Sequence, residues 1–125
     1  MVVEPNEKAS IGKVSFETVP AYNVTKPFHP KENHWVGYIL ECEGQRIYVA
    51  GDTDHLPELE SISCDVALVP VGGTYTMTAE EAAELMNQMN PKKAIPTHYG
   101  LIVGKKEDGI RFQNLVTNTQ VEIQI

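Results

Sequence analysis

The sequence predicts an α/β domain built on a mixed β-sheet, and two observations lead to this class. Residues 65–70 form a short run that is apolar on both faces, which is typical of a central strand with a covering layer on each side. Residues 46–97 contain, in order, a strand, a short helix, a strand, a longer helix and a strand. Right-handed crossovers make the strands of such a run parallel. The length of 125 residues suits one domain.

The first part of the chain predicts antiparallel strands. Residues 14–19 alternate apolar and polar side chains, as a half-buried strand does. Residues 35–42 and 46–50 are a predicted hairpin around the turn Glu43-Gly44-Gln45. The segment between them, residues 21–34, is a polar loop without periodicity, and a loop of this length inside a compact domain is more often functional than not.

Residues 78–89 predict the clearest helix in the chain. Thr78 is the expected N-cap, and Glu81 completes a capping box with it. Asn90 and Pro91 end the helix. Its buried stripe consists of Ala82, Leu85, Met86 and Met89. Shorter elements are predicted as a helix at about 56–61, a strand at 93–97, a weak helix near 110–117 and a terminal strand at 121–125.

Composition excludes several classes of partner. Ten Lys and Arg residues stand against 17 Asp and Glu, a net charge of −7, so neither nucleic acid nor an anionic membrane is expected as a partner. The longest apolar run, Val66–Val71, is far shorter than the roughly 18 residues of a membrane span. The first residues lack the apolar stretch of a secretory signal, and two cysteines are too few for a disulfide framework. We therefore expect a cytoplasmic protein.

Candidate metal ligands follow two of the predicted parallel strands. The carboxyl ends of parallel strands share one edge of a sheet, so Asp52, after the first strand, and His98, after the last, are expected to be neighbours. A carboxylate and an imidazole together are ordinary ligands for zinc, manganese or iron. The alternative is that Asp52 caps backbone N–H groups in a turn and that His98 is a structural histidine.

A catalytic zinc takes three protein ligands, so further donors are needed. His34 begins the hairpin that leads to Asp52 and is a tentative third ligand, with a solvated loop histidine as the alternative. His29 binds substrate or simply packs. Asp54 either supports the metal ligands or caps the following helix, and His55 is expected to be exposed.

The loop after residues 65–70 offers backbone donors. Gly72 and Gly73 supply N–H groups beside the same edge, which suit an anion or a developing oxyanion, although a flexible connection is the alternative. No serine has the small flanking residues of a nucleophile elbow, and neither cysteine lies where a helix N-terminus would activate it. Covalent nucleophilic catalysis is therefore not predicted.

Three segments together carry a resemblance to a known family. They are Tyr48–Asp54, Ile95–Gly100, and Val69–Met77 with the following Glu80–Ala83. Over most of residues 14–103 the chain resembles the metallo-β-lactamase-fold metal-dependent hydrolases, above all their lactonase-like and uncharacterised branch. The resemblance implies an α/β (α+β) fold that is half of a four-layer αββα sandwich, a mixed sheet with helices on one face. It also implies that Asp52 and His98 are catalytic metal ligands. In the hydrolase hypothesis, Asp54 and Tyr99 are expected to support these ligands.

The family's His-x-His-x-Asp-His motif belongs to its N-terminal half, and these 125 residues contain none. We therefore expect residues 1–125 to be a single domain equivalent to the C-terminal half. Without the other half, an apolar sheet face with residues such as Val66 and Leu68 is left exposed, and such patches mark interfaces. The expected partner is a separate N-terminal half or a second copy of the chain, with a truncated domain as the alternative.

The predicted function is that of a metal-dependent hydrolase half-domain. A divalent metal, zinc first, with manganese or iron as alternatives, activates water against an ester, lactone, amide or phosphoester of a small molecule. Alone, the chain is expected to be weak or inactive. The alternative is a non-enzymatic interaction or regulatory remnant of the same fold.

Overall fold

The computed structural model describes residues 4–22, 36–73, 76–100 and 105–124, and it places seven strands in one sheet in chain order. The strands are β1 (Lys8–Ile11), β2 (Val14–Pro20), β3 (Val36–Cys42), β4 (Gln45–Val49), β5 (Val66–Pro70), β6 (Lys93–Thr97) and β7 (Gln120–Val121). The helices are α1 (Ala79–Met89) and α2 (Lys106–Leu115), with a 3-10 helix at Pro57–Leu59.

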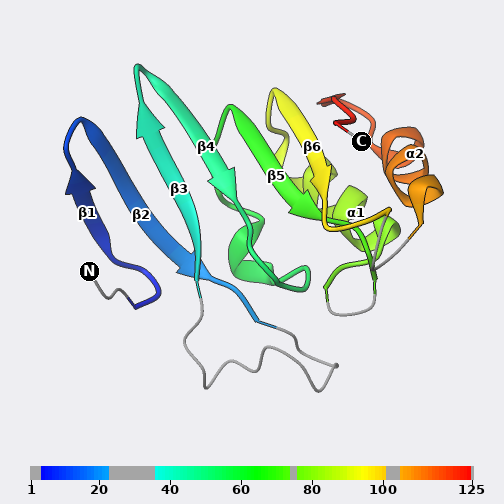
Figure 1. The fold of residues 1–125 in the computed structure, drawn as a ribbon, viewed down its shortest axis with the longest axis horizontal. Coiled ribbons are helices and arrows are strands. Elements are labelled where there is room, and N and C mark those ends of the chain that lie inside the picture. The colour runs from blue at the N-terminus through cyan, green and yellow to red at the C-terminus, as the bar shows by residue number, and fades with distance from the viewer. Residues whose placement is uncertain (1–3, 23–35, 74–75, 101–104, 125) are drawn as a thin grey trace.

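The sheet is mixed, as predicted. Strands β1 to β4 pair antiparallel, whereas β4, β5, β6 and β7 pair parallel. The arrowheads of β4, β5 and β6 point to the same edge of the sheet, at the bottom of Figure 1. The hairpin of β3 and β4 has the predicted turn, with Glu43 and Gly44 both at positive φ.

Helix α1 confirms the prediction from local sequence. The Thr78 side chain accepts the backbone N–H of Glu81 at 3.1 Å, and the Glu81 carboxylate accepts the N–H of Thr78 at 3.0 Å. Both helix-end donors are thereby satisfied. The helix ends at Asn90, which adopts the left-handed conformation.

Four elements differ from the prediction. Strand β1 was not expected, because its four residues are mostly exposed and carry no apolar alternation. Helix α2 begins earlier than the predicted residue 110, because the Asp108 carboxylate accepts the N–H of Lys105 at 2.7 Å and caps the first turn. The predicted terminal strand is reduced to Gln120–Val121, and the helix expected at about 56–61 is a single 3-10 turn.

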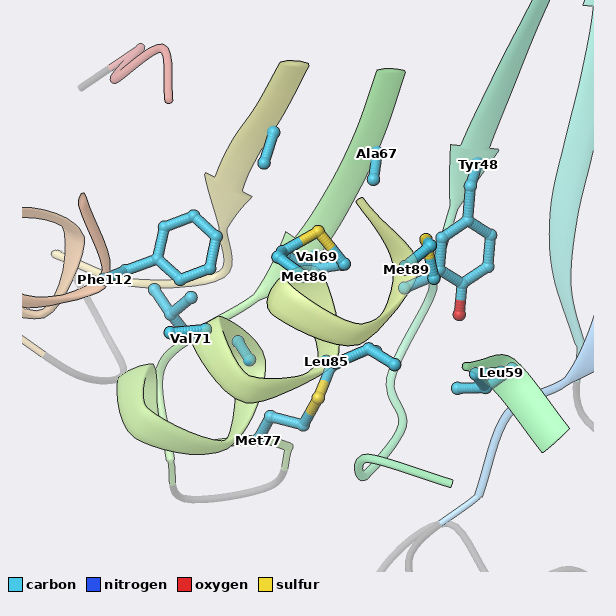
Figure 2. Packing of buried hydrophobic residues seen from close by; sticks show 14 of the residues in the cluster. Tyr48, Leu59, Ala67, Val69, Val71, Met77, Leu85, Met86, Met89 and Phe112 are labelled. Carbon is cyan, nitrogen blue, oxygen red and sulfur yellow. The ribbon is translucent and has the colours of Figure 1, made fainter. Parts of the chain in front are cut away.

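The helices cover one face of the sheet. Tyr48, Ala67 and Val69 point toward α1, where Met86 and Met89 pack on them (Figure 2), and Phe112 of α2 belongs to the same buried cluster. No helix within the described parts of the chain is long and apolar enough to cross a membrane.

The opposite face of the sheet has no covering layer in the described residues. Side chains alternate along a strand, so the neighbours of Ala67 and Val69 point away from the helices. The strand register aligns partly exposed apolar residues into two rows: Phe16, Leu40, Ile47 and Val66, then Tyr38, Val49, Leu68 and Ile95. We call these eight residues the open apolar face. The expectation that Val66 and Leu68 lie on such a face is confirmed.

Tyr48 gives a prediction about stability. Its ring belongs to the same buried cluster as Met89 and Leu59 (Figure 2). Its hydroxyl is fully buried and has no hydrogen-bond partner among the described residues, and burial raises the pKa of Tyr48. An unsatisfied buried hydroxyl is destabilising, so we expect Tyr48→Phe to raise the free energy of unfolding by about 1 kcal/mol in urea denaturation. Tyr38→Phe, at a partly exposed ring, should change little. A clear loss of stability in Tyr48→Phe would show that the hydroxyl is satisfied.

Candidate metal centre

The loops after β4, β5 and β6 meet at the edge to which these strands point. The N–H of Ala50 donates to the carbonyl of Leu68 at 3.0 Å, and the N–H of Val71 donates to the carbonyl of Thr97 at 3.1 Å. The hydrogen bonds between the parallel strands therefore continue up to the loops. Gly51 has φ +70 and turns the chain there. A Cβ at Gly51 would lie 3.2 Å from the carbonyl oxygen of Val36, so a side chain would be crowded as well as strained.

Asp52 and His98 come together at this edge. The Nε2 atom of His98 lies 3.8 Å from Oδ1 of Asp52, and both side chains are partly open to solvent, at 38% and 44% exposed. The spatial prediction made from the βαβαβ order is therefore confirmed. The two groups face each other from segments that are far apart in the sequence.

The spacing of this pair fits a shared divalent metal. Two ligand atoms of a tetrahedral zinc, each about 2.1 Å from the ion, lie about 3.4 Å apart. The observed 3.8 Å is close enough for a small side-chain rotation to bring both atoms onto one ion. Within the described residues no group of three or more His, Cys, Asp and Glu side chains is assembled. The described part of the chain thus offers two donors and not a closed site.

The backbone of His98 is strained. Its φ is +60, a left-handed conformation that brings Cβ close to the following carbonyl and is uncommon outside glycine. Such conformations cost about 1–3 kcal/mol and persist where the surrounding structure over-determines them. They cluster at functional sites, which agrees with the position of His98 beside Asp52.

The strain at His98 can be measured by comparing two substitutions that both remove the imidazole. We expect His98→Gly to unfold with a free energy about 1 kcal/mol higher than His98→Ala, because only glycine adopts a positive φ without a Cβ penalty. Thr97, in the extended conformation of β6, is the matched control. There the order should reverse, with Thr97→Ala more stable than Thr97→Gly. Equal stabilities of the two His98 variants would contradict a strained backbone.

Thr53 was not singled out from the sequence, and it fixes the Asp52 loop. Its hydroxyl accepts the N–H of Tyr22 at 3.2 Å and lies 3.0 Å from the carbonyl oxygen of Asp54, to which it can donate. Its own carbonyl accepts the N–H of Met77 at 3.2 Å. Thr53 is fully buried and ties the end of β2, the Asp52 loop and the approach to α1 together. The Gly-Asp-Thr order was the only sequence signal for this role.

Asp54 and His55 also follow Asp52. Asp54 is 5% exposed, and its N–H donates to the carbonyl of Tyr22 at 2.9 Å. The predicted capping role is wrong, because Leu56 occupies the N-cap position of the 3-10 helix. His55 is only 16% exposed rather than open to solvent, and its Nε2 lies 3.8 Å from Oε1 of Glu60.

The loop geometry bears on one of the two predicted glycine donors. The N–H of Gly73 donates to the carbonyl of Met77 at 3.0 Å, so it is already used within the loop. The predicted role of Gly73 as an anion donor is therefore wrong in this conformation, and Gly72 is the remaining candidate. The loop closes on itself before α1, with Gly72 opposite Thr78.

Tyr99 follows His98 and is 5% exposed. Its ring lies on Gly109 of α2, where an added Cβ would come within 2.5 Å of the hydroxyl oxygen. Burial raises the pKa of Tyr99, and its hydroxyl has no hydrogen-bond partner among the described residues. The other predicted site residues, His29 and His34, lie outside the described residues.

The fold and this site define a class of protein. Residues 1–98 match the family described as "Beta-lactamase superfamily domain", and the chain belongs to that family. Its fold is that of the metallo-β-lactamase-fold metal-dependent hydrolases, as the resemblance implied.

Individual relatives agree with this assignment. The UPF0173 metal-dependent hydrolase of Thermococcus onnurineus is 32% identical over 108 residues, which cover 82% of this chain and 48% of the relative. A similar protein of Pyrococcus furiosus is 32% identical over 111 residues, covering 85% of this chain and 49% of the relative. The chain spans about half the length of these relatives.

Solved structures show the same architecture. A candidate metal-dependent hydrolase from Parabacteroides distasonis superimposes with a TM-score of 0.86 at 34% identity, over 98% of this chain and 56% of that one. A candidate Zn-dependent hydrolase of the metallo-β-lactamase superfamily from Thermotoga maritima gives a TM-score of 0.74 at 26% identity, over 98% and 71% of the two chains.

Proposed function

We propose that this chain contributes Asp52 and His98 to the metal centre of a hydrolase that acts on a small molecule. The observation that carries the proposal is the 3.8 Å approach of the carboxylate and the imidazole at the carboxyl edge of the parallel strands. Open α/β sheets place their sites at this edge. The family membership supports the same assignment.

The two side chains have distinct roles in this proposal. The Asp52 carboxylate balances the charge of a divalent cation, and His98 offers the lone pair of Nε2 to it. A bound cation supplies Lewis-acid activation of water for cleavage of an ester, lactone, amide or phosphoester. Zinc suits a carboxylate and imidazole pair, and manganese and iron remain alternatives. The N–H of Gly72, in the loop after β5, is the proposed donor to negative charge that develops on the substrate.

The remaining ligands are proposed to come from a partner that covers the open apolar face. Two donors do not make a catalytic zinc site. The chain spans about half the length of its relatives, and the uncovered face of its sheet is apolar across β2 to β6. We infer that this face binds a polypeptide equivalent to the part of the relatives that this chain does not match. Self-association of the chain through the same face is the other outcome of the test. We also propose that the protein is cytoplasmic.

A non-enzymatic role is the second candidate. The specific observation in its favour is that the described residues assemble fewer than three metal-binding side chains. In that case the open apolar face is the functional surface, and the Asp52–His98 pair is a remnant.

Metal loading separates the two candidates. The chain is incubated with zinc, cobalt or manganese, alone and with the separately expressed unmatched segment of the Thermococcus onnurineus relative, and freed of unbound metal by gel filtration. Bound metal is then counted by elemental analysis, and hydrolysis of p-nitrophenyl acetate, a γ-lactone and bis-p-nitrophenyl phosphate is followed before and after chelation. The hydrolase proposal predicts retained metal and chelator-sensitive turnover in the mixture. Absence of bound metal in every sample would favour the non-enzymatic role.

A further inference from the structure

Tyr99 has an arrangement that the proposed metal centre does not by itself explain. We propose that Tyr99 is a positioning residue for His98, and that it acts through its ring, seated on Gly109 of α2, rather than through its hydroxyl. This inference rests on the proposed function only where it concerns metal affinity. The part that concerns the orientation of the His98 imidazole applies to the chain without metal.

The Tyr99 ring lies directly against the backbone of α2 because residue 109 is glycine; we call this contact the seat of the ring. A Cβ at Gly109 would lie 2.5 Å from the hydroxyl oxygen of Tyr99 and 2.7 Å from its Cε2 and Cζ atoms. Real Cβ atoms do not approach other atoms so closely, so only glycine lets this ring lie directly on the helix backbone. Glycine is disfavoured inside helices relative to alanine. Gly109 lies in the first half of α2 and is buried, so the contact with Tyr99 gives a packing reason for glycine at this position.

His98 lies between two fixed points. On one side, Thr97 pairs with Pro70 of β5 and accepts the N–H of Val71 at 3.1 Å. On the other side, the Tyr99 ring is held against α2. Because a left-handed conformation is unfavourable for histidine, something must hold φ at +60. The strand on one side and the seated ring on the other supply that restraint, and they direct the imidazole toward Asp52.

The hydroxyl of Tyr99 does not reach Asp52 or His98 through a hydrogen bond. It is buried against Gly109 and has no hydrogen-bond partner among the described residues. The ring accounts for the packing, whereas the oxygen contributes no polar contact there. Removal of the hydroxyl and displacement of the ring should therefore have different consequences for His98.

The test compares Tyr99→Phe, Gly109→Ala and the double variant Tyr99→Leu/Gly109→Ala. The first readout is the NMR spectrum of the imidazoles in the ¹⁵N-histidine-labelled apo chain, in which His55 serves as an internal reference. The second is the zinc dissociation constant measured by competition with a chromophoric chelator. Ile39→Val, in the core of β3 and remote from α2, controls for a general loss of stability.

We expect Gly109→Ala to shift or broaden the His98 signals while those of His55 stay in place, and to weaken zinc binding at least tenfold. Tyr99→Phe should leave the His98 signals in place and the zinc dissociation constant within about twofold of that of the unmodified chain. The double variant should lose no more than Gly109→Ala alone, because either substitution already removes the Tyr99 ring from its contact with α2. Ile39→Val should change neither readout.

Three results would overturn the proposal. Unchanged His98 signals in Gly109→Ala would show that the seat does not position the imidazole. An effect of Tyr99→Phe as large as that of Gly109→Ala would assign the role to the hydroxyl. If Gly109→Ala does not fold, Tyr99→Leu alone must shift the His98 signals. Unchanged His98 signals in Tyr99→Leu would also overturn the proposal. If zinc binds neither to the unmodified chain nor to its mixture with the partner segment, the proposed function fails, while the NMR comparison still decides the positioning role.

Discussion

Replacing Asp52 and His98 together with alanine is expected to abolish metal retention. These two side chains are the donors that the described structure brings within 3.8 Å of each other. Removing a residue that only hydrogen-bonds to a metal ligand already lowers metal affinity by about 10–100-fold. Removing two ligands should therefore lower metal affinity by more than about 100-fold. Elemental analysis after gel filtration should find the double variant nearly metal-free, with the single variants between it and the unmodified chain.

Two control variants test whether any histidine or aspartate would have the same effect. His55→Ala removes a histidine that lies near Glu60, and Asp65→Asn alters a carboxylate at the amino end of β5. The Asp65 carboxylate accepts the N–H of Arg46 at 2.9 Å, which together with Lys92 lowers the pKa of Asp65. Both control variants should retain metal. Undiminished metal content in the double variant of Asp52 and His98 would show that the metal binds elsewhere in the chain.

The second large effect is expected on the open apolar face. Leu68 lies in the middle of this face, between Val49 and Ile95 in the strand register. A carboxylate buried there without a partner costs several kcal/mol, and about 3 kcal/mol corresponds to a loss of affinity of about 100-fold. We therefore expect Leu68→Asp to weaken binding of the unmatched segment of a relative by at least about 100-fold in calorimetric titration.

The matched control is Gln88→Asp, which adds the same charge to the exposed side of α1. This variant should bind the partner segment as the unmodified chain does. Light scattering of the chain alone distinguishes the alternative occupant, because self-association through the same face should disappear in Leu68→Asp and persist in Gln88→Asp. A chain that is monomeric and binds no partner segment, or two variants with equal affinity, would refute the proposed interface.

Much of the fold was predictable because its signals are local. Thr78 and Glu81 form a capping box within four residues, and α1 has its apolar stripe in one continuous segment. The hairpin turn at Glu43 and Gly44 is equally local. The approach of Asp52 to His98 is not local, but it follows from the handedness of crossovers once three strands and the intervening helices are recognised.

The remaining features depend on contacts between distant segments. Strand β1 exists because β2 is there to pair with it, and its own residues carry no apolar pattern. The roles of Thr53, Tyr99 and Gly109 arise where loops and α2 pack against one another, and no spacing in the sequence identifies those neighbours. The use of the Gly73 N–H within its own loop likewise depends on the position of Met77.

Anomalous diffraction from a zinc-loaded crystal tests the metal centre most directly. Data collected on both sides of the zinc absorption edge locate the ion independently of any assumption about its ligands. The proposed centre predicts one peak at the carboxyl edge of β4 and β6, about 2.0–2.2 Å from both a carboxylate oxygen of Asp52 and Nε2 of His98. A fully occupied zinc bound by neither side chain would contradict it.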